Sequence, residues 1–284
     1  NLVQKVFYRV ISPFLSDVSY ANMNLRRWFG GGDVRHPKTF NEKMQWLKIY
    51  DRNPLYVQLA DKYSVRSFVE KRIGQEFLND LLGVYSTPDE IDWSKLPKAF
   101  VLKATWGSGM NIFVRDKESI DRVKISRLMN DWLRIDYSKR GREWVYRDIP
   151  RRFIAERLIL DSEGRIPYDY KIFCFDGEPR YIQVDVDRFG EHTRAYFDEE
   201  WRRQPFTILY RQFDGNISRP LHLDRMLEAA RSLSKGIPFV RVDFYAIPKV
   251  IFGEMTFYPG NGTEPFVPAE WDQKLGKLIR LPRL

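Results

Sequence analysis

Residues 240–262, VRVDFYAIPKVIFGEMTFYPGNG, restrict the fold most, because they predict two apolar β-strands joined by a turn near residues 247–249. Such a turn places Asp243 opposite Glu254. Side chains alternate along a strand, so one face of the hairpin is expected to carry Arg241, Asp243, Tyr245, Val250, Phe252, Glu254 and Thr256. The chain is therefore expected to build a sheet with two carboxylates on one face.

Two carboxylates in paired positions need a positive charge between them, because paired side chains lie roughly 5 Å apart at Cβ. A divalent cation meets this need, and Mg²⁺ prefers a few carboxylates together with phosphate oxygens and water. Asp243 and Glu254 therefore predict a magnesium site that serves a nucleotide. The alternative is that Arg241 or another basic residue neutralises both acids, and spacing alone does not separate the two.

A second candidate site lies in residues 100–111, FVLKATWGSGMN. Lys103 stands on a strand of apolar or small residues just before Gly107, Ser108 and Gly109. Glycines let backbone N–H groups approach a phosphate closely, and a lysine adds a point charge to the same ligand. The stretch matches neither the phosphate-loop pattern nor the full dinucleotide fingerprint, so a plain hairpin turn is the alternative.

The first 75 residues are expected to be mainly helical. Thr39 precedes Glu42 by three residues, which predicts a capping box for a helix over residues 39–52. Asn53 and Pro54 open a second helix, and Asp61 is a candidate cap for a third, which ends at Gly74. Residues 1–15 have apolar side chains at helical spacing, which favours a docking helix, with membrane-surface association as the alternative.

Strand signals dominate the rest of the chain. Residues 98–114 predict a strand, a glycine turn and a second strand, followed by a helix over about residues 120–137. In residues 169–187, Asp176-Gly177 predicts a tight hairpin turn. A helix over about residues 224–235, stopped by Gly236, precedes the carboxylate hairpin.

Composition narrows the function classes. A chain of 284 residues that is 43% hydrophobic can form one large domain or two smaller ones. Its single cysteine, Cys174, excludes an internal disulfide, and the three histidines have no metal-ligand spacing, so a reducing compartment and no zinc site are expected. The net charge of +9 favours an anionic partner. The excess of Lys and Arg is dense over residues 115–152. This basic stretch predicts either a solvated helical face or a surface that binds a polyanion.

Taken in order, these motifs resemble the TupA-like ATP-grasp family. The stretches that carry the resemblance span residues 36–262 and are HPKTFNEKMQWLKIYDRNP, LADKYSVRSFV, FVLKATWGSG, YDYKIFCFDGEPRYI and RVDFY with FGEMTFYPGNG. The resemblance implies an α+β fold in which two subdomains with antiparallel sheets grip ATP. It divides the chain into a helical region at 1–75, a small subdomain at 76–155 and a large subdomain at 156–284.

The resemblance also implies roles for individual residues. Lys103 would contact the phosphates of ATP under a lid formed by Gly107, Ser108 and Gly109. The adenine hinge would comprise Glu156, Arg157, Leu158 and Ile159, with the backbone of Arg157 and Ile159 reading the base. Arg241 and Lys171 would be catalytic, and Asp243 and Glu254 would bind Mg²⁺.

One metal ligand departs from the wider fold, in which Glu-x-Asn is common. This chain has Thr256 where that pattern has Asn, so either Thr256 or Asn261 is expected to complete the metal site. Lys62, Lys171, Arg188 and Arg194 are candidates for further anion contacts.

The implied activity is a carboxylate–amine ligase that uses ATP and Mg²⁺ and passes through an acyl phosphate. The family is linked to acidic cell-surface polysaccharides, so the expected partners are a uronic acid acceptor and a small amine or amino acid, with no nucleic acid. The expected location is the cytoplasm, with peripheral contact at the inner face of the membrane as an option. A kinase that phosphorylates a glycan and a non-catalytic polyanion-binding module are the alternatives.

Overall fold

The computed structural model describes residues 14–139, 141–187 and 190–283. The predicted opening helix and Arg188 lie largely or wholly outside these ranges. Within them, no helix combines the length and the apolar character that a membrane crossing requires.

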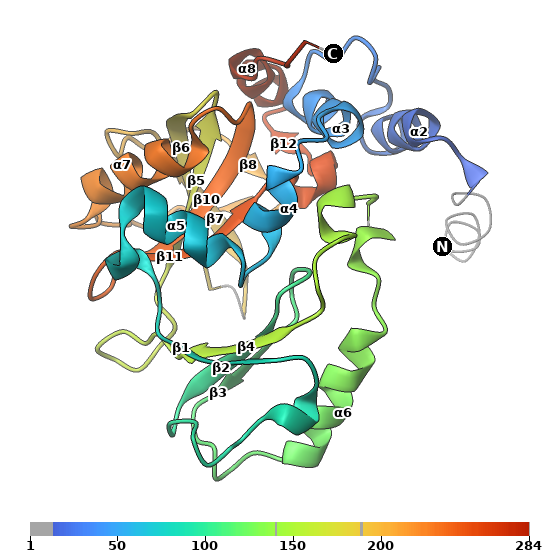
Figure 1. The fold of residues 1–284 in the computed structure, drawn as a ribbon. Helices are drawn as coiled ribbons and strands as arrows, with labels where there is room; N and C mark the ends of the chain where they lie inside the picture. Colours follow the sequence, from blue (N-terminus) through green and yellow to red (C-terminus); the bar gives the residue numbers. More distant parts are fainter. Residues whose placement is uncertain (1–13, 140, 188–189, 284) are drawn as a thin grey trace.

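The chain forms two lobes (Figure 1). The smaller lobe holds a four-stranded antiparallel sheet in the order β1-β4-β2-β3 and one long helix, α6. Its elements are β1 (Leu81–Tyr85), β2 (Phe100–Ala104), β3 (Asn111–Val114), α6 (Arg122–Leu133) and β4 (Phe153–Arg157). β4 pairs with β1 and β2 up to Arg157, so Glu156 and Arg157 lie in this sheet.

The larger lobe is built on a six-stranded sheet in the order β11-β10-β5-β6-β7-β9. Its strands are β5 (Asp169–Phe175), β6 (Glu178–Val186), β7 (Thr193–Phe197), β9 (Arg211–Gln212), β10 (Phe239–Tyr245) and β11 (Ile251–Thr256). A two-stranded sheet pairs β8 (Thr207–Ile208) with β12 (Phe266–Val267). The helices of this lobe are α2 (Asp17–Phe29), α3 (Phe40–Tyr50), α4 (Leu55–Ala60), α5 (Val65–Ile73), α7 (Leu223–Ser234) and α8 (Glu270–Leu278). Short 3₁₀ turns are η2 (Gln75–Phe77), η3 (Pro88–Glu90), η4 (Tyr137–Lys139), η5 (Trp144–Tyr146) and η6 (Pro259–Gly262).

Local signals place the N-terminal helices as predicted. The Thr39 side chain accepts from the Glu42 backbone N–H and Glu42 reaches back to Thr39, which confirms the capping box of α3. α5 begins at Val65 rather than directly after Asp61, because the Asp61 carboxylate instead bonds the turn at residues 63–64. Gly74, with φ 106°, ends α5.

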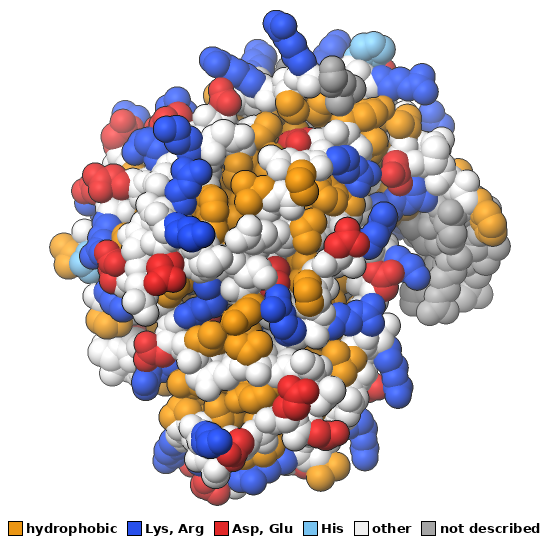
Figure 2. All heavy atoms as spheres, viewed as in Figure 1, with side chains coloured by type: hydrophobic (Ala, Val, Ile, Leu, Met, Phe, Trp, Pro, Cys, Tyr) orange, Lys and Arg blue, Asp and Glu red, His pale blue; other side chains and the backbone are white. Residues whose placement is uncertain are grey.

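The helix α6 carries three of the Lys and Arg residues of the basic stretch at residues 115–152, namely Arg122, Lys124 and Arg127. Its buried residues are Ile125, Met129 and Trp132, while Arg122 and Lys124 are exposed. Both predicted alternatives, a solvated helical face and a polyanion-binding surface, require this exposure, so the choice between them stays a prediction. Figure 2 shows Lys and Arg side chains spread over both lobes with Asp and Glu side chains among them.

Both predicted hairpins form, with one change of detail. Asp176 and Gly177 take φ values of 52° and 82°, as a tight turn between β5 and β6 requires. Asp243 pairs with Glu254 and Arg241 with Thr256, which confirms the predicted register at the carboxylates.

The shared face predicted for Phe252 and Glu254 is wrong. A bulge shifts the register after Asp243, so Phe252 pairs with Phe244 on the buried apolar side. Gly253 occupies the bulge, where an added Cβ would lie 3.1 Å from the Asp243 carbonyl oxygen. The extra residue turns Phe252 into the core and leaves Glu254 opposite Asp243.

The two faces of the six-stranded sheet differ in character. Val240, Val242 and Cys174 are buried on the face that α7 covers, where the Cys174 thiol lies 4.0 Å from the Ala230 carbonyl oxygen. Arg241 and Lys171 stand at the alternate positions of the same strands and therefore point to the opposite face. Alternation therefore aims one row of polar side chains toward the smaller lobe.

Candidate active site

A cavity of about 390 Å³ lies between the lobes. Strands β2 and β3 wall it on one side, and β5, β10 and β11 wall it on the other. The lining residues are Lys62, Asn79, Val101, Lys103, Ser108, Gly109, Asn111, Phe113, Arg157, Leu158, Ile159, Ile166, Asp169, Lys171, Asp243, Tyr245, Gly253 and Glu254. The predicted site residues outside this lining are Gly107, Glu156, Arg241, Thr256 and Asn261.

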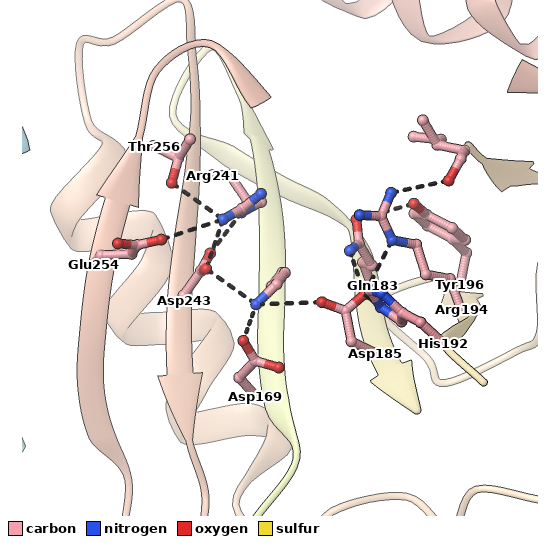
Figure 3. A network of polar contacts seen from close by, with 12 residues as sticks. Asp169, Gln183, Asp185, His192, Arg194, Tyr196, Arg241, Asp243, Glu254 and Thr256 are labelled. Carbon is pink, nitrogen blue, oxygen red and sulfur yellow. Dashed lines mark hydrogen bonds and ion pairs between the residues drawn. The ribbon is translucent and has the colours of Figure 1, made fainter. Parts of the chain in front are cut away.

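Arg241 joins the carboxylate pair. Its Nε and Nη2 donate to the two Asp243 carboxylate oxygens, each at 2.7 Å, and Nη2 lies 3.5 Å from Glu254 Oε1 (Figure 3). Burial disfavours the charged guanidinium, but the Asp243 carboxylate outweighs it and holds the pKa of Arg241 above its usual value. Arg241 thus supplies the positive charge that the pair requires, which was one of the two alternatives from spacing.

Lys171 is a buried hub on β5. Its ammonium bonds Asp169, lies 3.3 Å from Asp243 Oδ2, and lies 3.6 Å from Asp185 Oδ2. All four side chains are at most 11% exposed. Lys171 therefore ties three strands together at the cavity floor by charge.

The polar row continues beyond the hub to β7. Arg194 Nε donates to Asp185 Oδ1 at 3.0 Å, and Arg194 Nη1 lies 3.2 Å from Glu264 Oε2. Burial by itself raises the pKa of Asp185, but Lys171 and Arg194 outweigh burial and lower that pKa well below its usual range. Arg194, predicted as an anion contact, is thus held by two carboxylates.

Lys103 is paired across the smaller sheet. Its Nζ lies 2.7 Å from Glu156 Oε2, and Arg66 Nη1 holds the other oxygen of Glu156 at 2.9 Å. Burial tends to lower the pKa of Lys103, but the charge of Glu156 and its neighbours raises it above its usual value. Lys103 therefore keeps its positive charge while lining the cavity.

The glycine turn is anchored at one end and open at the other. The Lys62 ammonium donates to the Gly107 carbonyl at 2.5 Å, and an added Cβ on Gly107 would collide with the Tyr137 ring. Ser108 and Gly109 are exposed and line the cavity. Lys62 also lies 3.5 Å from Glu254 Oε2, so one lysine connects the turn to the carboxylate pair.

At the predicted hinge, the backbone of Arg157 is already engaged. Its N–H donates to the Asp80 carbonyl at 3.1 Å, and its carbonyl accepts from the Asn79 amide at 2.8 Å. Within the part of the chain that the structure describes, no hydrogen bond joins the backbone of Leu158 or Ile159 to another residue. Leu158 and Ile159 are therefore better placed than the Arg157 N–H to contact a base.

The two candidates for the further metal ligand have other partners. The Thr256 hydroxyl accepts from Arg241 Nη2 at 3.1 Å. The Asn261 side-chain oxygen accepts from the buried Lys48 at 2.5 Å, and burial lowers the pKa of Lys48 below its usual value. A metal role for Asn261 would require that bond to break.

Asp243 and Glu254 suit a metal whose remaining ligands are phosphate oxygens and waters. No group of three or more His, Cys, Asp or Glu side chains that could hold a metal occurs among residues 14–139, 141–187 and 190–283. Asp243 and Glu254 supply two carboxylates, and Mg²⁺ takes one or two carboxylates when phosphates and waters complete its shell. A carboxylate has several lone-pair sites, so Asp243 can hold Arg241 and a metal together.

Asp169 and Asp185 were missed by the sequence reading. Each lies two residues from a polar strand residue, Lys171 or Gln183, so alternation places it on the same face. That signal was present in the sequence. Their convergence on Lys171 depends on the order of the strands, which the sequence did not display.

If Lys103 contacts the phosphates of ATP, as the family resemblance implies, replacing it with alanine is expected to raise the Kd for ATP about tenfold or more, because a charged hydrogen bond is lost. Isothermal calorimetry measures the change. The fold should persist because Arg66 still pairs with Glu156. The matched control is Lys98→Ala, at a lysine of the same lobe whose side chain is 76% exposed. Equal ATP affinity in both variants would remove Lys103 from the site.

Comparison with known proteins adds a family and a set of structures. The family described as TupA-like ATPgrasp matches residues 42–280. No curated protein sequence matches the chain. The solved structures that resemble it include a D-alanine–D-alanine ligase from Bacillus anthracis, with 18% identity, a TM-score of 0.41, and coverage of 70% of this chain and 57% of the ligase.

A second similar structure is N5-carboxyaminoimidazole ribonucleotide synthetase in complex with ADP. It shares 11% identity at a TM-score of 0.45, over 76% of this chain and 50% of that one. An N5-carboxyaminoimidazole synthase from Aspergillus clavatus, in complex with ADP and 5-aminoimidazole ribonucleotide, shares 12% identity at a TM-score of 0.40, over 70% of this chain and 44% of that one. The chain thus spans about half the length of these proteins.

Proposed function

Because this chain belongs to the TupA-like ATP-grasp family, we propose that it is an ATP- and Mg²⁺-dependent carboxylate–amine ligase. Its proposed acceptor is a uronic acid of a cell-surface polysaccharide or a precursor, and its second substrate is a small amine or amino acid. The observation that carries the proposal is the cavity between the lobes, which joins Lys103, the glycine turn and the carboxylate pair.

The nucleotide would lie along this cavity. Leu158 and Ile159 would contact the base at one end, and Lys103 with the turn at Ser108 and Gly109 would contact the phosphates. Lys62 would lie beside the phosphates together with the glycine turn, because its ammonium already donates to the Gly107 carbonyl.

Asp243 and Glu254 would hold magnesium at the phosphate end. When bound, magnesium neutralises charge on the phosphates. Arg241 and Lys171 reach the same end and would stabilise negative charge on the transferred phosphoryl group.

In the proposed reaction, an oxygen of the acceptor carboxylate attacks the γ-phosphorus of ATP, and the bond to ADP breaks. The amine nitrogen then attacks the carbon of the acyl phosphate, phosphate leaves, and the nitrogen loses a proton. Lobe closure would keep water from the acyl phosphate. The net charge of +9 is consistent with an acidic acceptor.

Hydroxylamine tests this reaction, because it converts acyl phosphates to hydroxamates. Incubation of the protein with ATP, Mg²⁺, a glucuronic-acid-containing glycan and hydroxylamine is expected to give ADP and a hydroxamate, detected by mass spectrometry. Omission of the glycan should abolish both products, because the acyl phosphate needs its carboxylate.

Other products would contradict the proposal in distinct ways. A stable phosphorylated sugar would identify a kinase. Folded protein that consumes no ATP with any of a range of uronic acid acceptors would end the glycan assignment, and absence of ATP binding in Mg²⁺ would favour a polyanion-binding module.

A further inference from the structure

One end of the larger lobe holds much of the excess positive charge. This end surface is formed by residues 26–38, from the last turn of α2 through the following loop, and by residues 270–283, which include α8. The two segments carry eight Lys and Arg residues and three acidic residues, so they hold +5 of the net charge of +9. Figure 2 shows Lys and Arg side chains gathered over α8 and the loop before α3, at the top of the view. Charge gathered at one end favours an anionic partner there.

The two segments pack into one surface. An added Cβ on Gly276 would collide with the Lys38 carbonyl oxygen, so α8 lies directly against the end of the loop. The Glu42 carboxylate fixes that loop by accepting from the backbone N–H groups of Asp33 and Lys38. Lys43 donates to the Gly276 carbonyl at 2.8 Å and so joins α3 to α8. The charges of the end surface are therefore held on a common frame.

Most of the basic side chains here have no carboxylate partner. Asp272 is buried, Lys274 pairs with Glu270, and Arg280 pairs with Asp176. Among the residues that the structure describes, no ion pair holds five further exposed side chains, which are Arg26, Arg35, Lys38, Lys277 and Arg283. Their charge is available to an anion outside the protein.

An exposed tryptophan stands beside these charges. Trp28 lies in the last turn of α2 and is 48% exposed, and the Arg27 guanidinium lies 5.3 Å from the centre of its ring. Tryptophan favours the headgroup region of a membrane, because its ring is apolar and its N–H is polar. Lys and Arg beside such a ring attract anionic lipids. The combination fits a lipid surface better than a small soluble anion.

The end surface is separate from the proposed nucleotide site. None of its basic residues lines the cavity between the lobes. The smaller lobe lies at the opposite end of the molecule (Figure 1). Contact through the end surface would therefore leave that cavity accessible to substrates.

We infer that the end surface docks on a membrane that contains anionic phospholipids, with its Lys and Arg side chains at the lipid phosphates and Trp28 among the headgroups. A bilayer presents many phosphates in one plane, which matches basic side chains spread over two helices and a loop. The inference does not depend on the ligase reaction. It places the membrane contact on the folded larger lobe, apart from the opening segment at residues 1–15.

The test is cosedimentation of the full chain with phosphatidylcholine vesicles that contain about one third phosphatidylglycerol. The test variant combines Arg35→Gln, Lys38→Gln, Lys277→Gln and Arg283→Gln. It is expected to bind these vesicles about a hundredfold or more less tightly, because each basic residue at an anionic surface contributes about fivefold. Vesicles of phosphatidylcholine alone should bind little protein, and high salt should release it from the anionic vesicles.

Trp28→Ala is expected to weaken vesicle binding about threefold or more, because it removes the ring that enters the headgroup region. Leu221→Ala is its control, since Leu221 is 86% exposed and precedes α7, outside the end surface. It should leave vesicle binding unchanged.

A matched control for the charges combines Lys98→Gln, Lys124→Gln, Arg127→Gln and Arg134→Gln, all at exposed side chains of the smaller lobe. It has the same net charge as the test variant and should bind the vesicles within about twofold of the original chain. Residues 1–13 are unchanged in both variants, so a difference between them reports on the end surface. Thermal unfolding should give similar melting temperatures, because every replaced side chain is exposed.

Three outcomes would overturn the inference. One is failure of the original chain to bind anionic vesicles, or binding that the test variant retains. Another is an equal loss in both four-site variants, which would mean that net charge alone governs binding. The last is a single-stranded RNA that binds as tightly as the vesicles with the same loss in the test variant, which would make the end surface a general polyanion site. None of these measurements uses ATP turnover, so the ligase proposal keeps its separate test with hydroxylamine.

Discussion

Replacing Glu254 with glutamine should reduce Mg²⁺-dependent ATP turnover roughly a hundredfold or more, the scale on which electrostatic groups at a reaction centre contribute. The substitution keeps the shape of the side chain and removes one of the two charges that would hold the metal. Glu254 is also partly exposed, at 31% of its side chain, so its loss should change the melting temperature little. Steady-state kinetics across a magnesium titration, with thermal unfolding in parallel, measures both quantities.

The control is Glu191→Gln, which removes the same charge from a side chain that is 90% exposed. It should leave turnover unchanged. A Glu254→Gln variant that loses stability in proportion to activity would show that Glu254 and Asp243 form a structural pair around Arg241.

Replacing Lys171 with methionine should destabilise the fold by about 3–5 kcal/mol at neutral pH, because it leaves buried carboxylates without a shared cation. Asp185 and Asp243 keep Arg194 and Arg241 as partners, but all three carboxylates around Lys171 lose its charge. Urea unfolding measures the free energy difference.

The pH dependence of that deficit has a definite sign. In the original chain the pKa of Asp185 is lowered, so its stabilising contribution is present above its unfolded pKa, about 3.9, and is lost as pH falls through the folded value. Removal of Lys171 takes away one of the charges that lower the pKa of Asp185, so the pKa of Asp185 is higher in the folded variant than in the original chain. The variant should therefore recover part of its deficit as pH falls from 8 toward 5, when the Asp185 carboxylate begins to take up a proton.

Lys95→Met is the matched control, since Lys95 is 82% exposed and pairs with Asp92 at the surface. Its effect should be within about 0.5 kcal/mol at every pH. A deficit for Lys171→Met that stays constant between pH 8 and pH 5 would mean that lost packing, and not unpaired charge, causes it.

Several features of the fold follow from short-range rules and were predictable from the chain itself. The Thr39–Glu42 capping box starts α3 because both hydrogen bonds close within one helical turn. Asp176 and Gly177 form a hairpin turn because they accept positive φ. The predicted turn near residues 247–249 placed Asp243 opposite Glu254, and the two residues do pair.

The bulge at Gly253 could not be read in the same way. A glycine in a strand signals a bulge or a close approach, but it does not say which register the partner strand keeps. The burial of Phe252 against Phe244 decided it, and that contact exists only once the apolar face is covered.

Sequence alone thus determined many of the elements, the carboxylate pair and the family resemblance, because turns, caps and alternation act over a few residues, but it did not predict β1, β7 or α8. Tertiary structure decided which charges meet. Lys103 bonds Glu156, 53 residues away, and Lys48 bonds Asn261, 213 residues away. These pairs depend on strand order and helix packing, which burial of apolar surface from the whole chain selects, so no local pattern encodes them.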